Sequence, residues 1–162
     1  MANANETPVP DPARGGEALE RDLPLALKGR TLEEAGWCRI DALTLCVPLW
    51  SPSADCFLLR LQFHCYPEWP PSAQFVNPIT KDYKLGDDDR WLPNIEAPHL
   101  RVHPNYNDQK RQLICNSTTL EFYDLRHSVE ARHVWDPERH NFNHTLFTIT
   151  EAMRLYYRGR QG

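Results

Sequence analysis

A regular alternation of apolar and polar side chains over residues 56–66 constrains the fold of this chain more than any other feature. The apolar members are Phe57, Leu59, Leu61, Phe63 and Cys65, and the polar members between them are Arg60, Gln62 and His64. Successive side chains of a β-strand point to opposite faces, so this pattern predicts a strand with one face on the core. Pro67 ends it.

Two other segments predict strands of the same sheet. Residues 37–47 are rich in apolar and β-branched side chains and stop at Pro48, and residues 73–77 form a short run closed by Pro78. Because short connections join the three strands, we expect an antiparallel meander. Proline makes up 14 of the 162 residues, and its positions inside ordered sequence indicate stiff, extended connections.

Two helices are expected to flank the strands. Residues 18–28 carry leucines that suit a short helix, although Pro24 weakens this prediction unless it lies in the first turn. Near the C-terminus an apolar stripe predicts a stronger helix, capped by Asn141 or Asn143 and ended by Gly159. The stripe consists of Phe142, Leu146, Ile149, Met153 and Tyr156 or Tyr157. The predicted fold class is α+β, with helices packed on an antiparallel sheet.

Composition suggests how the chain is divided. Residues 1–16 have almost no bulky apolar side chain and are expected to be a disordered leader before a single domain, residues 17–162. Residues 81–98 carry several aspartates without periodicity and are expected to form a long acidic surface insertion.

Charge and hydropathy exclude some partners. A formal net charge of -4 provides no basic field for a phosphate backbone, so nucleic acid is not expected as a partner. No run of 18 apolar residues exists that could span a membrane, and the first residues lack the features of a secretory signal. We therefore expect a cytoplasmic protein.

The five cysteines are unevenly placed. They are Cys38, Cys46, Cys56, Cys65 and Cys115. An odd number without a Cys-x-x-Cys pair argues against a disulfide framework and a structural zinc site, so no metal is expected. Cys115 follows a short apolar pair and precedes polar sequence, which places it at the edge of an ordered segment, where its thiol could perform acyl transfer. The alternative is one more half-buried cysteine.

Two loops accompany this cysteine. A turn at His103-Pro104-Asn105 would fold the chain back and bring the Asn105 amide toward Cys115, where it could stabilise an oxyanion. The alternative is that Asn105 only ties the turn to its own backbone. Residues 66–71, with three prolines, form a stiff connection on which Trp69 either caps the core or anchors a partner.

Taken in order, these motifs resemble the core of ubiquitin-conjugating enzymes. The matching pieces are the strand of residues 57–66, Tyr66 to Pro71, Gln74 to Val76, His103 to Asn105, Cys115, Trp135-Asp136-Pro137 and the last helix. The resemblance implies a fold of that family's type and an activity in which a cysteine carries a ubiquitin-like modifier as a thioester and passes it to an amine. It implies no organic cofactor.

The resemblance also assigns residues by position. Cys115 would hold the thioester, Asn105 would stabilise the oxyanion or adjoining loop, and His103 would shape the turn. The side chains on the loop that meets a ligase would be Tyr66, Pro67, Trp69, Pro70 and Pro71. The implied partners are a ubiquitin-like modifier, an adenylating activating enzyme and a ligase.

Departures from the family pattern indicate a divergent member, similar to those of bacterial conjugation operons. Residues 77–102 replace a tight link, and the spacing from Asn105 to Cys115 is about two residues longer than is usual in the family. Pro98-His99 and residues 92–95 are therefore rival candidates for the turn. The chain also ends after one helix where the family's last helices are expected.

Carboxylates and histidines that follow Cys115 allow more than one function. Asp124 and Asp136 lie beyond Cys115, where a carboxylate could assist an acceptor amine, but each could equally be a solvated acid or a helix cap. Four histidines also follow Cys115, at spacings that match no zinc pattern: His127, His133, His140 and His144. An imidazole paired with Cys115 would favour a thiol hydrolase, and an incidental Cys115 would favour an inactive binding module of the same fold.

Overall fold

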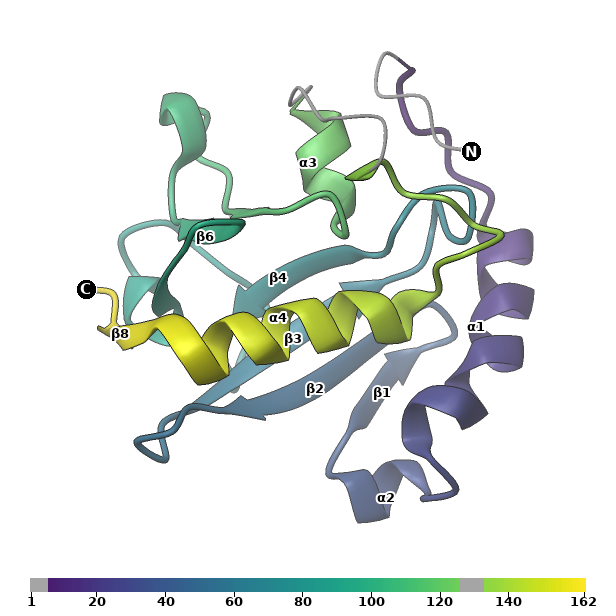
Figure 1. Cartoon of the computed structure of the whole chain (residues 1–162), viewed down its shortest axis with the longest axis horizontal. Helices are drawn as coiled ribbons and strands as arrows, with labels where there is room; N and C mark the ends of the chain where they lie inside the picture. Colours follow the sequence, from purple (N-terminus) through teal and green to yellow (C-terminus); the bar gives the residue numbers. More distant parts are fainter. Residues whose placement is uncertain (1–5, 126–132) are drawn as a thin grey trace.

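Four consecutive antiparallel strands form the first sheet of the protein (Figure 1). They are β1 (Cys38–Asp41), β2 (Thr44–Trp50), β3 (Cys56–Gln62) and β4 (Ser72–Val76). The computed structural model describes residues 6–125 and 133–162. Its two antiparallel sheets and flanking helices make an α+β fold, as expected, and the strands at its centre are a meander.

The alternation in β3 places the core as predicted. Phe57, Leu59 and Leu61 are at most 1% exposed, whereas the residues that alternate with them, Leu58, Arg60 and Gln62, are half-buried on the opposite face. The strand ends at Gln62, earlier than the predicted residue 66, although the Phe63 amide still donates to the Leu43 carbonyl.

The segment predicted as one strand ending at Pro48 is two strands. A turn at residues 42–43 separates β1 from β2, and Pro48 lies inside β2, opposite Leu58. The β2–β3 pairing uses the amide of every second residue, so the nitrogen of Pro48 points toward the β1 side. The last β1 pair is Cys38 with Cys46. A proline is tolerated there because no neighbouring strand needs its missing N–H.

A second sheet, which the sequence did not indicate, adjoins the first. Its order is β7 (Leu113–Cys115), β6 (Leu100–His103), β5 (Pro93–Ala97) and β8 (Tyr157–Arg160). The strand β5 and the short helix η1 (Asp89–Trp91) lie within residues 81–98, so that segment is not one irregular acidic loop. Asp88 is buried there and accepts hydrogen bonds from Asn77 and the Lys84 amide.

Helix α1 (Pro12–Leu27) begins inside the segment predicted to be a disordered leader. Asp11 caps it by accepting from the Arg14 amide, and Gly15 packs so closely on the Phe63 carbonyl that any side chain would clash. The prediction of a disordered leader is therefore wrong for residues 12–16. The lack of a bulky apolar side chain there reflects packing and not disorder, because the close contact of the helix with the Phe63 carbonyl leaves no room for a side chain at Gly15. Pro24 lies inside the helix, and the carbonyl left without its N–H belongs to Glu20, which is exposed to water.

Helix α4 (Phe142–Tyr156) crosses the inner face of the first sheet (Figure 1). The predicted stripe is correct: Phe142, Ile149 and Met153 are buried, and Asn141 caps the helix by accepting from the Asn143 amide. Gly159 does not end it, since the helix passes directly into β8 at Tyr157. The short helices α2 (Leu32–Ala35), α3 (Leu120–Asp124) and η2 (Tyr106–Asp108) complete the described elements.

Candidate functional site

Cys115 is the last residue of β7 and lies opposite Arg101 of β6. The chain folds back between these strands, as predicted, and the side chain of Cys115 is half-buried rather than enclosed. Asn116, the next residue, donates to the His99 carbonyl and accepts from the Thr118 amide and hydroxyl. These bonds fix the chain after Cys115 against the turn at residues 98–99.

A cavity of about 780 Å³ opens beside Cys115. Its walls come from the turn that precedes β6, the residues that follow Cys115, α3 and the first half of α4. Lining side chains include His99, Arg101, Asn116, Phe122, His140 and His144. A cavity of this size is within the range of ligand-binding sites in proteins.

The thiol of Cys115 is not activated as in a cysteine hydrolase. Burial raises the pKa of Cys115 above its ordinary value, and the positive charge of Arg101 lowers it only in part. At neutral pH the thiol is therefore mostly protonated, and a small thiolate fraction carries its reactivity.

Histidines His99, His133, His140 and His144 line the same cavity as Cys115. The backbone N–H of Asp136 donates to Nδ1 of His140 at 3.0 Å. Burial, followed by the charge of Arg139, lowers the pKa of His140, so its ring is neutral at pH 7 and carries its proton on Nε2. The ring of His144 stacks on it with centroids 4.6 Å apart, and burial likewise lowers the pKa of His144.

Within residues 6–125 and 133–162, no three His, Cys, Asp or Glu side chains form a group that could hold a metal ion. His127, the fourth histidine singled out in the sequence, lies outside the described residues.

Asn105 does not lie beside Cys115. His103 pairs with Leu113, so Asn105 falls beyond the paired strands, at the tip of the hairpin and away from the cavity. Its Oδ1 accepts from the Lys110 amide at 2.7 Å, and its Nδ2 donates to Asp108. The predicted oxyanion role is therefore wrong, and the alternative that Asn105 ties the turn to its own backbone is correct.

The rival turn at Pro98-His99 lies on the cavity of Cys115, the position expected for Asn105. It connects Ala97 to Leu100, which are paired residues of β5 and β6, and both of its residues line the cavity. His103, the last residue of β6, contacts the ring of Tyr106 in the other turn, with centroids 5.4 Å apart.

The two candidate acids lie outside the cavity wall. Asp124 pairs with Arg111 at 3.4 Å and lines a different cavity. Asp136 accepts from the Glu138 amide at 3.0 Å, which is the local capping role considered as its alternative. Neither carboxylate lines the cavity of Cys115: Asp124 is paired with Arg111, and Asp136 is held within its own turn.

The loop predicted to meet a partner is part of the core. Its five proposed contact residues are all buried: Tyr66, Pro67, Trp69, Pro70 and Pro71. Tyr66 donates to Asp22 and accepts from the Phe142 amide, and Trp135 Nε1 donates to the Pro67 carbonyl. Only Glu68 of this loop is exposed. The partner-binding assignment of these side chains is wrong, because the stiff loop joins α1, the sheet and α4.

The sequence did not indicate Arg101 and Phe122 as residues of the cavity beside Cys115, whereas His99 belongs to the rival turn that it did indicate. Arg101 could have been found only by knowing the register of β6 with β7, since the turn between them does not fix it. Phe122 is placed on the cavity by helix α3, which is too short to show a helical period in the sequence.

Comparisons with protein-family models, with curated proteins and with solved structures found no match. In the part of the chain that the structure describes, no helix is both long and apolar enough to cross a bilayer.

Proposed function

We propose that this chain is a conjugating enzyme of the ubiquitin-conjugating type, which carries a ubiquitin-like modifier as a thioester on Cys115 and transfers it to an amine. The observation that carries the proposal is the position of Cys115, half-exposed at a strand end beside a cavity of about 780 Å³. A protein donor reaches a nucleophile only at such an open position, and the cavity has room for the last residues of an extended chain.

The fold supports the same function. Along the chain, a helix is followed by an antiparallel meander, then by a hairpin whose second strand ends at Cys115, and then by a long helix across the inner face of the meander. This is the order of the family motifs. The proposed partners are a ubiquitin-like modifier and the activating enzyme that delivers it as a thioester.

The proposed reaction proceeds in two exchanges. The Cys115 thiol loses its proton to solvent, and its sulfur attacks the carbonyl carbon of the donor thioester. The donor thiolate then leaves and takes up a proton. In the second exchange a neutral amine attacks the same carbonyl carbon, the Cys115 thiolate departs, and the amine proton passes to solvent. The high pKa of Cys115 suits this sequence, because exchange between thioesters needs only a small thiolate fraction.

The state of His140 favours a carrier over a hydrolase. The lone pair of Nδ1 is engaged by the Asp136 amide, so the neutral ring can donate through Nε2 but cannot take a proton there. A donor in the cavity can stabilise an oxyanion, whereas a strong general base would activate water and destroy the thioester.

A direct test uses a labelled peptide that ends in a glycyl thioester of mercaptoethanesulfonate, which needs no activating enzyme. We expect a labelled adduct on non-reducing gels that reductant removes. The exposed Cys38 thiol can undergo the same exchange, so every chain tested carries Cys38→Ala. In that background Cys115→Ser should give a reductant-resistant ester, Cys115→Ala no adduct, and Cys56→Ala, which removes another half-buried thiol, an unchanged adduct. An adduct that persists in Cys115→Ala would overturn the assignment, and absence of an adduct in the parent chain would favour an inactive binding module.

A thiol hydrolase is the second candidate, because four histidines share the cavity with Cys115. The two functions differ in the fate of the acyl group. A carrier holds the adduct until an amine is added, and then releases peptide as an amide. A hydrolase releases free peptide acid in buffer alone, with repeated turnover of the thioester, and loses this turnover in His144→Gln.

A further inference from the structure

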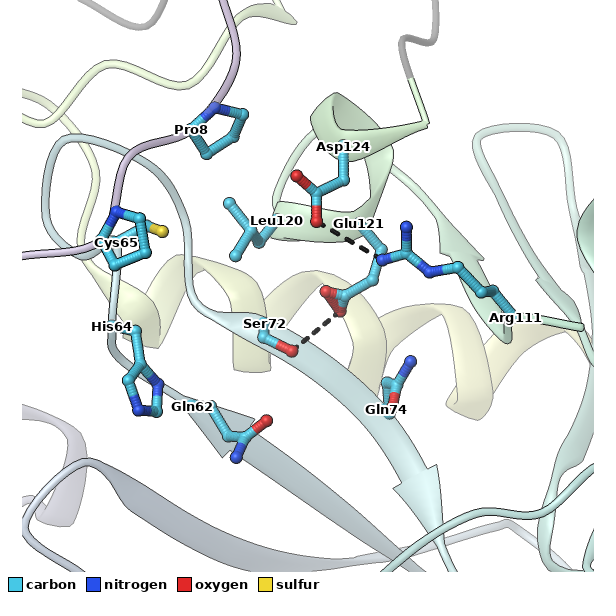
Figure 2. A pocket seen from close by; sticks show the side chains of 11 residues that line it. Pro8, Gln62, His64, Cys65, Ser72, Gln74, Arg111, Leu120, Glu121 and Asp124 are labelled. Carbon is cyan, nitrogen blue, oxygen red and sulfur yellow. Dashed lines mark hydrogen bonds and ion pairs between the residues drawn. The ribbon is translucent and has the colours of Figure 1, made fainter. Parts of the chain in front are cut away.

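A second cavity, of about 370 Å³, lies on the face of the first sheet opposite the core (Figure 2). Its floor is formed by Gln62 of β3 with Ser72 and Gln74 of β4, and Gln62 is paired directly with Ser72. Glu121 and Asp124 of α3 make one wall. Helix α3 therefore separates the two cavities, since Phe122 lines the cavity of Cys115.

The two ends of this cavity differ in chemistry. Arg111 and Asp124 form a charged end, joined by one contact of 3.4 Å between partly exposed side chains (Figure 2). Pro8 and Cys65 lie at the opposite end, beside His64, with Leu120 between the two ends. A molecule with a charged part and an apolar part fits this arrangement.

Glu121 is a buried carboxyl on the wall of this cavity, 3% exposed. Its Oε1 accepts from the Ser72 hydroxyl at 3.1 Å and from the Ala73 amide at 2.7 Å. Both hydrogen bonds from the sheet therefore end on one oxygen. Burial raises the pKa of Glu121 to about 7, so near neutral pH the carboxyl is partly protonated and can accept or donate a hydrogen bond.

Several polar side chains around the cavity have bonding capacity left. In the part of the chain that the structure describes, the side chains of Gln62 and His64 make no hydrogen bond, and Arg111 makes only its single contact with Asp124. A guanidinium has five donors in a planar fork. Polar groups from four separate segments thus converge on one space, as they do in small-molecule sites.

The balance of charge selects the kind of ligand. A simple anion drawn to Arg111 would also meet the carboxylate of Asp124 and the partly ionised Glu121, and a simple cation drawn to Asp124 would meet Arg111. A zwitterion, with its opposite charges a short distance apart, satisfies both sides of the Arg111–Asp124 pair.

We propose that this cavity binds a free α-amino acid with an aliphatic side chain. The carboxylate pairs with Arg111, the ammonium group pairs with Asp124, and the aliphatic side chain packs toward Pro8, Cys65 and Leu120. The inference is independent of the proposed conjugation at Cys115, which lies on the other side of α3.

Calorimetric titration of the full chain tests the proposal, with L-leucine as the probe. We expect saturable binding of L-leucine. N-acetyl-L-leucine lacks the ammonium group and L-leucinamide lacks the carboxylate, so each should bind at least tenfold more weakly. Equal binding of the three compounds, or no saturable binding of L-leucine, would overturn the proposal.

Variants and a second readout keep the test decisive. Arg111→Gln and Asp124→Asn should each weaken L-leucine binding at least tenfold, while the matched charge changes Arg158→Gln and Asp87→Asn should leave it unchanged. In the parent chain, L-leucine should shift the side-chain amide signals of Gln62 and Gln74 in nuclear magnetic resonance spectra, and should not shift that of Gln109. Shifts confined to other residues would contradict the site even if a variant failed to fold.

Discussion

Cys115 lies directly opposite Arg101 in the antiparallel pairing of β6 with β7. Side chains of directly paired residues extend to the same face of a sheet, so the guanidinium is held on the side of the thiol. Arg101 is also the charge that lowers the pKa of Cys115 against the effect of burial. The reactivity of this thiol therefore depends on a residue 14 positions earlier in the chain.

Replacing Arg101 should make Cys115 less reactive. In Arg101→Gln the thiol pKa should rise further, so the thiolate fraction at pH 7 and the rate of alkylation by iodoacetamide should fall by about two- to fivefold. Mass spectrometry of the Cys115 peptide measures the rate. Arg158→Gln makes the same charge change on exposed β8 and should leave the rate unchanged; an equal fall in both variants would refute a local effect.

Glu121 should make the protein less stable as pH rises. Its pKa is raised from 4.5 to about 7, so between these values the folded chain binds a proton that the unfolded chain has released. The contribution of Glu121 is fully present below about pH 4.5 and is lost as pH rises through 7, by up to about 3 kcal/mol.

Urea unfolding at pH 5 and pH 8 measures this dependence. Glu121→Gln keeps an oxygen for the Ser72 and Ala73 bonds but does not titrate, so it should be more stable than the parent chain at pH 8. Its free energy of unfolding should differ much less between pH 5 and pH 8 than that of the parent chain. If the variant keeps the full pH dependence of the parent, another group is responsible.

Trp69 should behave as a core residue and not as a contact for a partner. It is 7% exposed, and its ring packs on Tyr123 with centroids 5.2 Å apart. Trp69→Ala should reduce the free energy of unfolding by about 3 kcal/mol or more. Glu68→Ala, one residue earlier and exposed, should change it by less than about 1 kcal/mol. Equal, small effects in chemical unfolding would show that the loop is at the surface.

Local patterns in the sequence were sufficient for β3, β4 and α4, but not for the division of residues 37–50 into β1 and β2. The alternation of Phe57, Leu59 and Leu61 and the helical stripe from Phe142 to Met153 each record one buried face, which a single segment can reveal. The strands of the second sheet are three to five residues long, too short for a period to be visible.

Other features depend on contacts distant in sequence. Gln112 is buried and uses both ends of its amide to pair with the backbone of Phe75, at the open edge of β4. Glu121, also buried, accepts from the Ala73 amide at the same edge. Nothing in the local sequence distinguishes these side chains from exposed ones, because their partners are known only once the edge of the sheet is placed.

Asn105 provides the clearest separation of the turn role from a catalytic one. Asn105→Ala removes the acceptor of the Lys110 amide, so the chain should lose about 1 kcal/mol of stability, measured by urea unfolding. Adduct formation at Cys115 from the glycyl thioester should stay within about twofold of the parent rate, because the hairpin tip lies away from the cavity. If Asn105 stabilised the oxyanion, its replacement would instead slow the reaction by about a hundredfold or more. A fall of that size in the rate of adduct formation, with the hairpin still folded, would show that Asn105 takes part in the reaction and would contradict its position at the tip of the turn.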